Sequence, residues 1–268
     1  MKRPLLALIA GAAALLVQTQ GYAAAAPQVS PAERQKIESI IQDYLLNNPQ
    51  ILLEASKKLQ QQEQAKLQDK VRQSIATHAR DLFFTAANPI AGNPNGTLTL
   101  VEFFDYQCGH CKTMDPIVLG LIKKNPQLRI IFKPWPIFGA NSEYAAKAVL
   151  AAHEQGKYLP LHVALMKIKG ELSPALILET AKSVGLNTKK LESDMKDVGY
   201  AQQLHTNSKL ATELGSQGTP TFVLAALDPQ MGPPPANSDE NNIRAVFIPG
   251  GTSQAILQKL IDELGKKS

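Results

Sequence analysis

The two cysteines of this chain stand close together in the order Cys108, Gly109, His110, Cys111. They directly follow a short apolar run and begin a stretch with helical character. Such a pair is used in four ways: as half of a zinc site, for covalent haem attachment, as a structural disulfide, or for thiol–disulfide exchange. The surrounding residues decide among these uses.

The sequence disfavours the first three uses. Structural zinc needs four ligands, and the remaining ones would have to come from five histidines that lie far apart without metal-type spacing. Haem attachment requires a histidine directly after the second cysteine, where this chain has Lys112. A structural disulfide closing so short a loop restricts little chain entropy. We therefore predict redox catalysis, with no metal and no cofactor.

The start of a helix suits this chemistry. Its first backbone N–H groups are unpaired and its dipole is positive there, so a sulfur at that point is stabilised as a thiolate. We expect Cys108 to be the nucleophile, and Cys111, one turn later and more buried, to close or resolve the mixed disulfide. His110 can favour the Cys108 anion through its ring or its backbone N–H; the alternative is an idle, exposed histidine.

The elements that position the pair follow from hydrophobic periodicity. A loop rich in turn residues is expected at 88–96, and a proline-rich loop or hairpin excursion at 228–242. Strands are predicted at 97–104, 128–133, 221–227 and 244–248, and helical segments at 109–124, 141 to about 216 and 253–264. This order predicts an α/β sheet with a helical insertion.

The first 26 residues read as a targeting segment. Lys2 and Arg3 form a positive region, residues 5–17 are apolar, and small residues at 23–26 offer cleavage sites. The apolar run of about 13 residues is shorter than the roughly 20 that span a bilayer, although a retained anchor is the alternative. We expect residues 1–26 to be a cleaved signal peptide and the mature protein to be periplasmic, with surface or membrane association left open.

Residues 27–84 are predicted to be an N-terminal helical region. Ser30, Pro31 and Glu33 make a good helix start, and a second helical pattern runs from about 50 to 84. The polar run 60–64 has no core to face and reads as a solvent-bridging stalk.

The segment before that stalk is too small to bury its own apolar stripe. We therefore predict a homo-oligomer through residues 27–59, with a dimer favoured and a trimer open. The alternative is that the segment folds back on the catalytic domain.

Composition limits the partners. At 44% hydrophobic residues, the chain of 268 residues can bury a sizeable core. Loss of Lys2 and Arg3 with the leader leaves +3 of the formal charge of +5. This balance gives no reason to expect nucleic acid as a partner.

Three segments carry a family resemblance. Residues 99–112 resemble the active-site strand and helix of the DsbA family of thioredoxin-fold thiol:disulfide oxidoreductases, 218–222 its cis-proline loop, and 247–251 its last strand and turn. The resemblance covers about residues 88–266 and implies a thioredoxin-like catalytic domain at 85–268 with a helical insertion at about 141–200. The region 27–84 is similar to that of the subgroup that oligomerises through N-terminal helices.

The resemblance also implies roles for residues outside the cysteine motif. Pro220 would be a cis-proline facing the disulfide, and the backbone of Thr219 would pair with a bound substrate strand. Without the resemblance, this dipeptide would be an ordinary turn.

Glu102 is a carboxylate in an apolar strand, so burial should raise its pKa and suit it to pass protons to or from Cys111. A simple buried ion pair with Lys133 is the alternative.

We therefore expect an exported enzyme that exchanges a Cys108–Cys111 disulfide with thiols of unfolded or cysteine-containing polypeptides, together with a membrane redox partner. Gly-His between the cysteines, and threonine before the proline, are typical of protein disulfide isomerases, so the balance of oxidase and isomerase activity stays open. The excursion at 228–242 has no counterpart in the family pattern. A non-enzymatic exported dimeric binding or chaperone-like surface protein with a structural disulfide is the alternative function.

Overall fold

The structure is a computed structural model whose contacts divide the chain into two compact units, Met1–Gln61 and Gln62–Ser268. The residues it describes are 29–85, 88–228, 230, 232 and 243–266. The expected signal peptide at 1–26 lies outside the described residues, as does most of the expected excursion at 228–242.

The described part of the first unit is helical. Helix α1 (Pro31–Asn47) begins with the predicted capping box, in which the Glu33 N–H donates to Ser30 Oγ at 3.3 Å and the Ser30 N–H donates to Glu33 Oε2 at 2.9 Å. Helix α2 (Gln50–Thr77) follows after a break of two residues and crosses the unit boundary. Helix α1 buries none of its residues. Five of its large apolar side chains are 48–71% exposed: Ile37, Ile40, Ile41, Tyr44 and Leu46.

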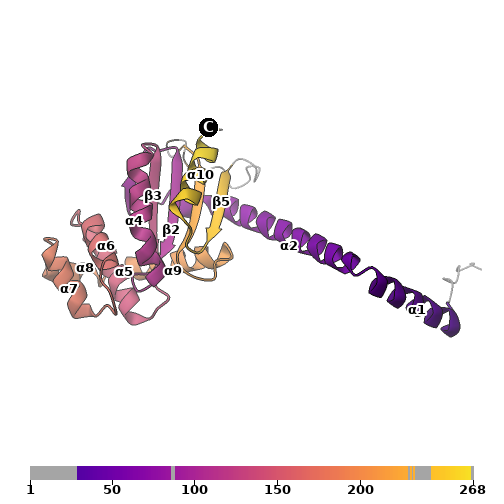
Figure 1. The fold of residues 1–268 in the computed structure, drawn as a ribbon. Helices are drawn as coiled ribbons and strands as arrows, with labels where there is room; N and C mark the ends of the chain where they lie inside the picture. Colours follow the sequence, from indigo (N-terminus) through magenta and orange to yellow (C-terminus); the bar gives the residue numbers. More distant parts are fainter. Residues whose placement is uncertain (1–28, 86–87, 229, 231, 233–242, 267–268) are drawn as a thin grey trace, which may run out of the picture. The chain divides into compact units, whose positions relative to one another are not determined.

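Within the described residues of the second unit, five strands form one sheet in the order β1-β3-β2-β4-β5 (Figure 1). Their bounds are β1 Ile90–Gly92, β2 Leu98–Phe104, β3 Leu128–Pro134, β4 Thr221–Ala226 and β5 Arg244–Pro249. Strands β2 and β3 are parallel, and the other neighbouring pairs are antiparallel. The four predicted strands are therefore confirmed.

Strand β1 corrects the prediction that 88–96 is entirely loop. It has only three residues, too few for an alternating pattern to be visible, and it pairs antiparallel with the edge of β3. Gly92 ends it with a φ of 80°, and a Cβ there would collide with the Leu128 carbonyl oxygen. The glycine thus allows the close approach that makes the strand.

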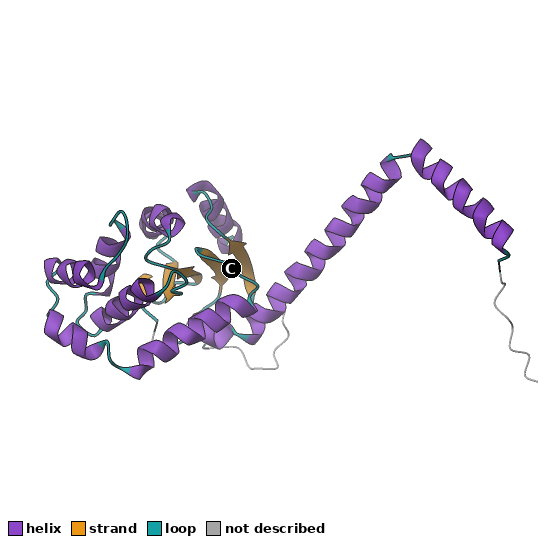
Figure 2. Ribbon diagram, turned by 90° about the horizontal axis from the view of Figure 1, so that it is seen from below, coloured by secondary structure: helices purple, strands orange, loops and turns teal. Residues whose placement is uncertain are grey.

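Helices account for most of the remaining chain (Figure 2). Helix α3 (Ala79–Phe83) follows α2, and α4 (Gly109–Lys124) has the predicted bounds. The predicted helical block consists of α5 Ala140–His153, α6 Tyr158–Met166, α7 Pro174–Ser183, α8 Thr188–Asp194 and α9 Val198–Glu213. Helix α10 (Gln254–Gly265) closes the chain as expected.

The sheet is buried on both faces, and β2 lies at its centre. Leu100 and Phe104 belong to a core shared with α4, α5, α6 and α10, whereas Val101 and Phe103 belong to a second core with α3 and α9. Because strand side chains alternate, the even-numbered residues of β2 face the first core and the odd-numbered residues face the second. The cysteine pair lies in the first core.

Candidate active site

Cys108 is the N-cap residue of α4, directly after the turn that leaves β2. Its sulfur lies 3.4 Å from the Cys111 backbone N–H, which donates to it, and 3.3 Å from the Thr219 carbonyl oxygen, to which the thiol donates. Both cysteines are free thiols, and their exposed fractions are 4% and 0%. The two sulfurs thus lie in the first turn of the helix, and Cys108 at the N-cap is the less buried of the two.

The two thiols differ strongly in acidity. The pKa of Cys108 is lowered to about 5 because the Cys111 side chain donates a hydrogen bond to its sulfur. The Thr219 side chain and the backbone N–H groups of Cys111 and His110 also lower it, and burial opposes them. The pKa of Cys111 is raised, first by burial and then by its hydrogen bond to Cys108. At neutral pH Cys108 is therefore the thiolate and Cys111 holds its proton.

His110 contributes through its backbone. Its N–H is one of the groups that lower the Cys108 pKa, while its side chain is exposed. The sequence left two ways for His110 to stabilise the Cys108 anion, its ring or its backbone N–H. In the structure it is the backbone N–H that does so.

The loop before β4 completes the surface around Cys108. The Thr219–Pro220 peptide bond is cis, as the resemblance implies, and Pro220 is buried. Behind it, the Thr221 hydroxyl donates to the Gly218 carbonyl at 2.8 Å and lies 2.6 Å from the Ser216 hydroxyl. These bonds fix the loop, so the Thr219 carbonyl stays beside the Cys108 sulfur.

Glu102 is buried in β2, with 1% exposure, and its Oε1 has no hydrogen-bond partner. Its pKa is raised well above the usual value, first by burial and then by the charges of Asp115 and Cys108. Burial thus favours the protonated form of the carboxyl, which interacts electrostatically with both cysteines.

The suggested ion pair between Glu102 and Lys133 is wrong. Glu102 is paired with Phe132 of β3, so Lys133, one residue later, points to the opposite face of the sheet. Lys133 is 1% exposed and donates to the Asp81 carbonyl oxygen at 2.7 Å. Burial lowers its pKa to about 7, against the attraction of Asp81.

Asp105 is a site residue that the sequence reading missed. Its carboxylate accepts hydrogen bonds from the N–H groups of Gln107, Ile137 and Phe138, at 2.7, 2.7 and 3.1 Å, and from the Ser142 hydroxyl at 2.7 Å. It thereby ties the turn before Cys108 to the loop after β3. A polar run directly after a buried strand was the available signal.

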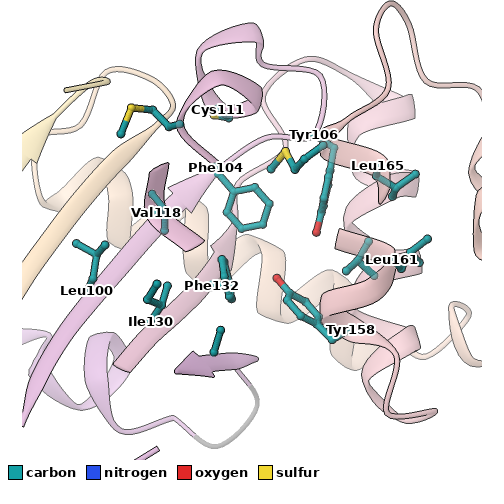
Figure 3. Close-up of a cluster of buried hydrophobic side chains, with 14 of the residues drawn as sticks. Leu100, Phe104, Tyr106, Cys111, Val118, Ile130, Phe132, Tyr158, Leu161 and Leu165 are labelled. Atoms are coloured by element: carbon teal, nitrogen blue, oxygen red, sulfur yellow. The ribbon is translucent and has the colours of Figure 1, made fainter. Parts of the chain in front are cut away.

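A second missed group lies beneath α4. Asp115 Oδ1 is 2.9 Å from His162 Nε2, and His162 Nδ1 is 3.0 Å from the Tyr106 hydroxyl. Tyr106 and Tyr158 direct their hydroxyl ends into the same part of the core, beside Phe104 and Phe132 (Figure 3). These groups come from α4, α6 and the turn after β2, so only the fold brings them together.

The histidine, cysteine, aspartate and glutamate side chains of the described residues form no group of three or more that could hold a metal ion. None of the helices seen in these residues is long and apolar enough to cross a membrane.

Two family models match the chain. The DSBA-like thioredoxin domain matches residues 99–262, and the copper resistance protein ScsC N-terminal domain matches residues 33–66. The first match covers β2, the cysteine pair, the helical block, the cis-proline loop and most of α10.

Curated relatives are similar over half of the chain. The Na(+)/H(+) antiporter NhaA 3 of Salinispora tropica is 27% identical over 135 residues, which are 50% of this chain and 21% of that protein. The chain thus spans about a fifth of that relative's length. The thiol:disulfide interchange protein DsbA of Bordetella parapertussis is 26% identical over 144 residues, 51% of this chain and 67% of that protein.

Solved structures cover more of the chain. BcfH of Salmonella enterica Typhimurium is 31% identical, with a TM-score of 0.70 over 87% of this chain and 96% of that one. A linker-deletion mutant of Proteus mirabilis ScsC is 27% identical, with a TM-score of 0.63 over 91% of this chain and 100% of that one. The predicted thioredoxin-like α/β fold with a helical insertion and an N-terminal helical segment is confirmed.

Proposed function

The chain belongs to the DSBA-like thioredoxin domain family, and from this premise we propose that it is an exported thiol:disulfide oxidoreductase that introduces disulfide bonds into polypeptides. The observation that carries the proposal is the unequal acidity of the cysteine pair. The pKa of Cys108, at the N-cap of α4, is lowered to about 5, whereas the pKa of the fully buried Cys111 thiol is raised. A stabilised thiolate favours the reduced enzyme, which makes the disulfide form an oxidant.

In the oxidase direction, a substrate thiolate attacks Cys108 Sγ of the enzyme disulfide. The bond between the two enzyme sulfurs breaks, and Cys111 leaves with the electron pair and takes up a proton. A second substrate thiolate then attacks the substrate sulfur of the mixed disulfide, and Cys108 leaves as its stable thiolate. The substrate loses two electrons and the enzyme disulfide gains them, so a membrane redox partner is needed to reoxidise the pair.

We assign the proton of Cys111 to Glu102. The carboxyl is buried on the same face of the sheet as the cysteines, burial favours its protonated form, and it interacts electrostatically with both sulfurs. A carboxylic acid of raised pKa can give its proton to a leaving thiolate and take it back later. Thr219 and Pro220 would align an extended substrate strand at Cys108, through the Thr219 backbone.

The same pair can isomerise disulfides when it is reduced. The Cys108 thiolate then attacks a wrong disulfide, and no net electrons are transferred. A dimer with two such sites would favour this activity. Export rests on the leader-like residues 1–26 and gives the oxidising compartment in which substrate disulfides persist.

The oligomer is proposed to form through residues 27–59. Support comes from the exposed apolar side chains of α1 and from the match to the ScsC N-terminal domain at 33–66. Sedimentation equilibrium of the protein without its leader should give a dimer, and Ile41→Glu combined with Tyr44→Glu should give a monomer. A wild-type monomer would refute the proposal, and a trimer would correct the subunit number.

The function is tested by the equilibrium reduction potential of the Cys108–Cys111 pair in a glutathione buffer, read by thiol alkylation. A reduction potential close to that of DsbA itself, about −120 mV, supports a disulfide donor. A reduction potential below roughly −220 mV indicates a reductant. Insulin reduction and reactivation of scrambled ribonuclease are measured in parallel. A non-enzymatic binding protein would do neither, and this outcome would refute the enzymatic proposal.

A further inference from the structure

A chain of three buried polar groups lies beneath the cysteine pair. His162 is fully buried and connects Asp115 of α4, at 2.9 Å, to Tyr106, at 3.0 Å. The three groups need one consistent set of protons. In the set that pairs both ring nitrogens of a neutral imidazole, the Tyr106 hydroxyl donates to Nδ1 and Nε2–H donates to the Asp115 carboxylate.

Aromatic rings hold the imidazole in place. The His162 ring stacks on Tyr158 with centroids 5.7 Å apart, and it contacts Phe132 at 4.7 Å and Phe104 at 5.2 Å. The imidazole is completely enclosed, so its hydrogen bond to the Asp115 carboxylate is shielded from solvent.

Asp115 faces the redox site. It lies one helical turn after Cys111 on the same helix, and both are buried in the same core layer. Its charge is one of the influences that raise the pKa of Glu102. Both carboxyl groups are buried, and two carboxylates that interact resist being ionised together.

Only one of these two carboxyls has a hydrogen-bond donor. Asp115 has His162, whereas Glu102 Oε1 has no partner. The two carboxyl groups are therefore unequal: Asp115 has a donor for its carboxylate, whereas burial without a partner on Oε1 disfavours the charged form of Glu102.

We propose that Asp115, His162 and Tyr106 are positioning residues of the exchange reaction, which hold a fixed negative charge below the cysteines and so keep Glu102 as the group that carries the exchangeable proton. This inference deepens the proposed function and rests on the role of Glu102 given there. The other titratable groups that face this space are Cys108 and Cys111 of α4 and Tyr158 of α6.

The test follows the Glu102 carboxyl directly, by ¹³C-carboxyl NMR titration of the full chain in its disulfide form, in which neither cysteine titrates. Glu102→Gln assigns the signal. In Asp115→Asn the midpoint should fall by about one pH unit, because the repelling charge is gone. In His162→Phe the Glu102 midpoint should also fall, because the Asp115 carboxylate loses the hydrogen bond from His162 that stabilises it.

The matched control is Glu213→Gln, which neutralises the carboxylate of another histidine pair, with His78 at 3.1 Å. Its Glu102 midpoint should equal that of the wild type. If His162→Phe does not fold, Asp115→Asn decides, because asparagine keeps the shape and the hydrogen-bond acceptor. A folded Asp115→Asn protein with an unmoved Glu102 midpoint would overturn the inference.

Insulin reduction by the wild type is measured on the same preparation. If the wild type is inactive while the Glu102 midpoint shifts, the proposed function fails and the electrostatic coupling stands. If the wild type is active and the midpoint does not move, only the further inference fails.

Discussion

Replacing Cys111 by alanine should raise the pKa of Cys108, because the Cys111 side chain provides the largest of the contributions that lower it to about 5. A hydrogen bond to a charged group contributes about 1.5–3 kcal/mol. One pKa unit corresponds to about 1.4 kcal/mol, so the Cys108 midpoint should rise by about one to two pH units. The backbone N–H groups of Cys111 and His110 remain and prevent a full return to the ordinary value.

The assay is the ultraviolet absorbance of the thiolate during a pH titration of the reduced protein. Cys111→Ser keeps a donor of similar size and should move the midpoint less than Cys111→Ala does. Cys108→Ala is the blank and should show no transition in the acidic range.

Stability provides a second measurement of the same quantity. The folded pKa of Cys108 lies below its unfolded value, so its contribution is present above the unfolded pKa and is lost as the pH falls through about 5. Between pH 7 and pH 5 the reduced wild type should lose about 2 kcal/mol through this group. In Cys111→Ala the loss should begin at higher pH. An unchanged Cys108 midpoint in that variant would refute the reasoning and assign the thiolate to the helix backbone alone.

Three further predictions concern stability, measured by urea unfolding of the disulfide form. The pKa of Lys133 is about 7 when folded, so the unfolded chain binds the extra proton above that pH; the free energy of unfolding should rise by about 3 kcal/mol from pH 7 to pH 10. Lys133→Met should abolish this rise. The prediction is contradicted if the free energies of unfolding of the wild type and of Lys133→Met change with pH in parallel. Asp105→Asn weakens an acceptor of four hydrogen bonds and should lower the free energy of unfolding by about 1–3 kcal/mol. An unchanged urea midpoint would show that the turn is stable without the carboxylate charge. Gly92→Ala should lower the free energy of unfolding more than Gly139→Ala does. Both glycines have positive φ, but only at Gly92 would the new Cβ collide with the Leu128 carbonyl oxygen. Equal losses of stability would contradict the collision.

The elements that position the cysteines could be predicted because their signals are local. The capping residues Ser30 and Glu33 mark the start of α1, and the N-cap position of Cys108 follows from its place between an apolar strand and a helical pattern. The chemistry of the pair depends on this local geometry. It was therefore predictable from the motif and its neighbours.

Contacts between distant segments were not predictable in the same way. Asp115 and His162 are 47 residues apart, and nothing in either segment points to the other. The error on Lys133 has the same origin, since its face of β3 depends on the register with β2. A register shift of one residue between β2 and β3 would have placed Lys133 on the same face as Glu102.

The alternation along β2 and β3 has a consequence for how this protein can change. Glu102 lies on the face with the cysteines, and Lys133 lies on the opposite face with α3 and α9. Substitutions on the second face leave the side-chain contacts of the sulfurs in place, because the backbone of the sheet lies between them. The durability and the chemistry of this domain therefore depend on two different sets of residues.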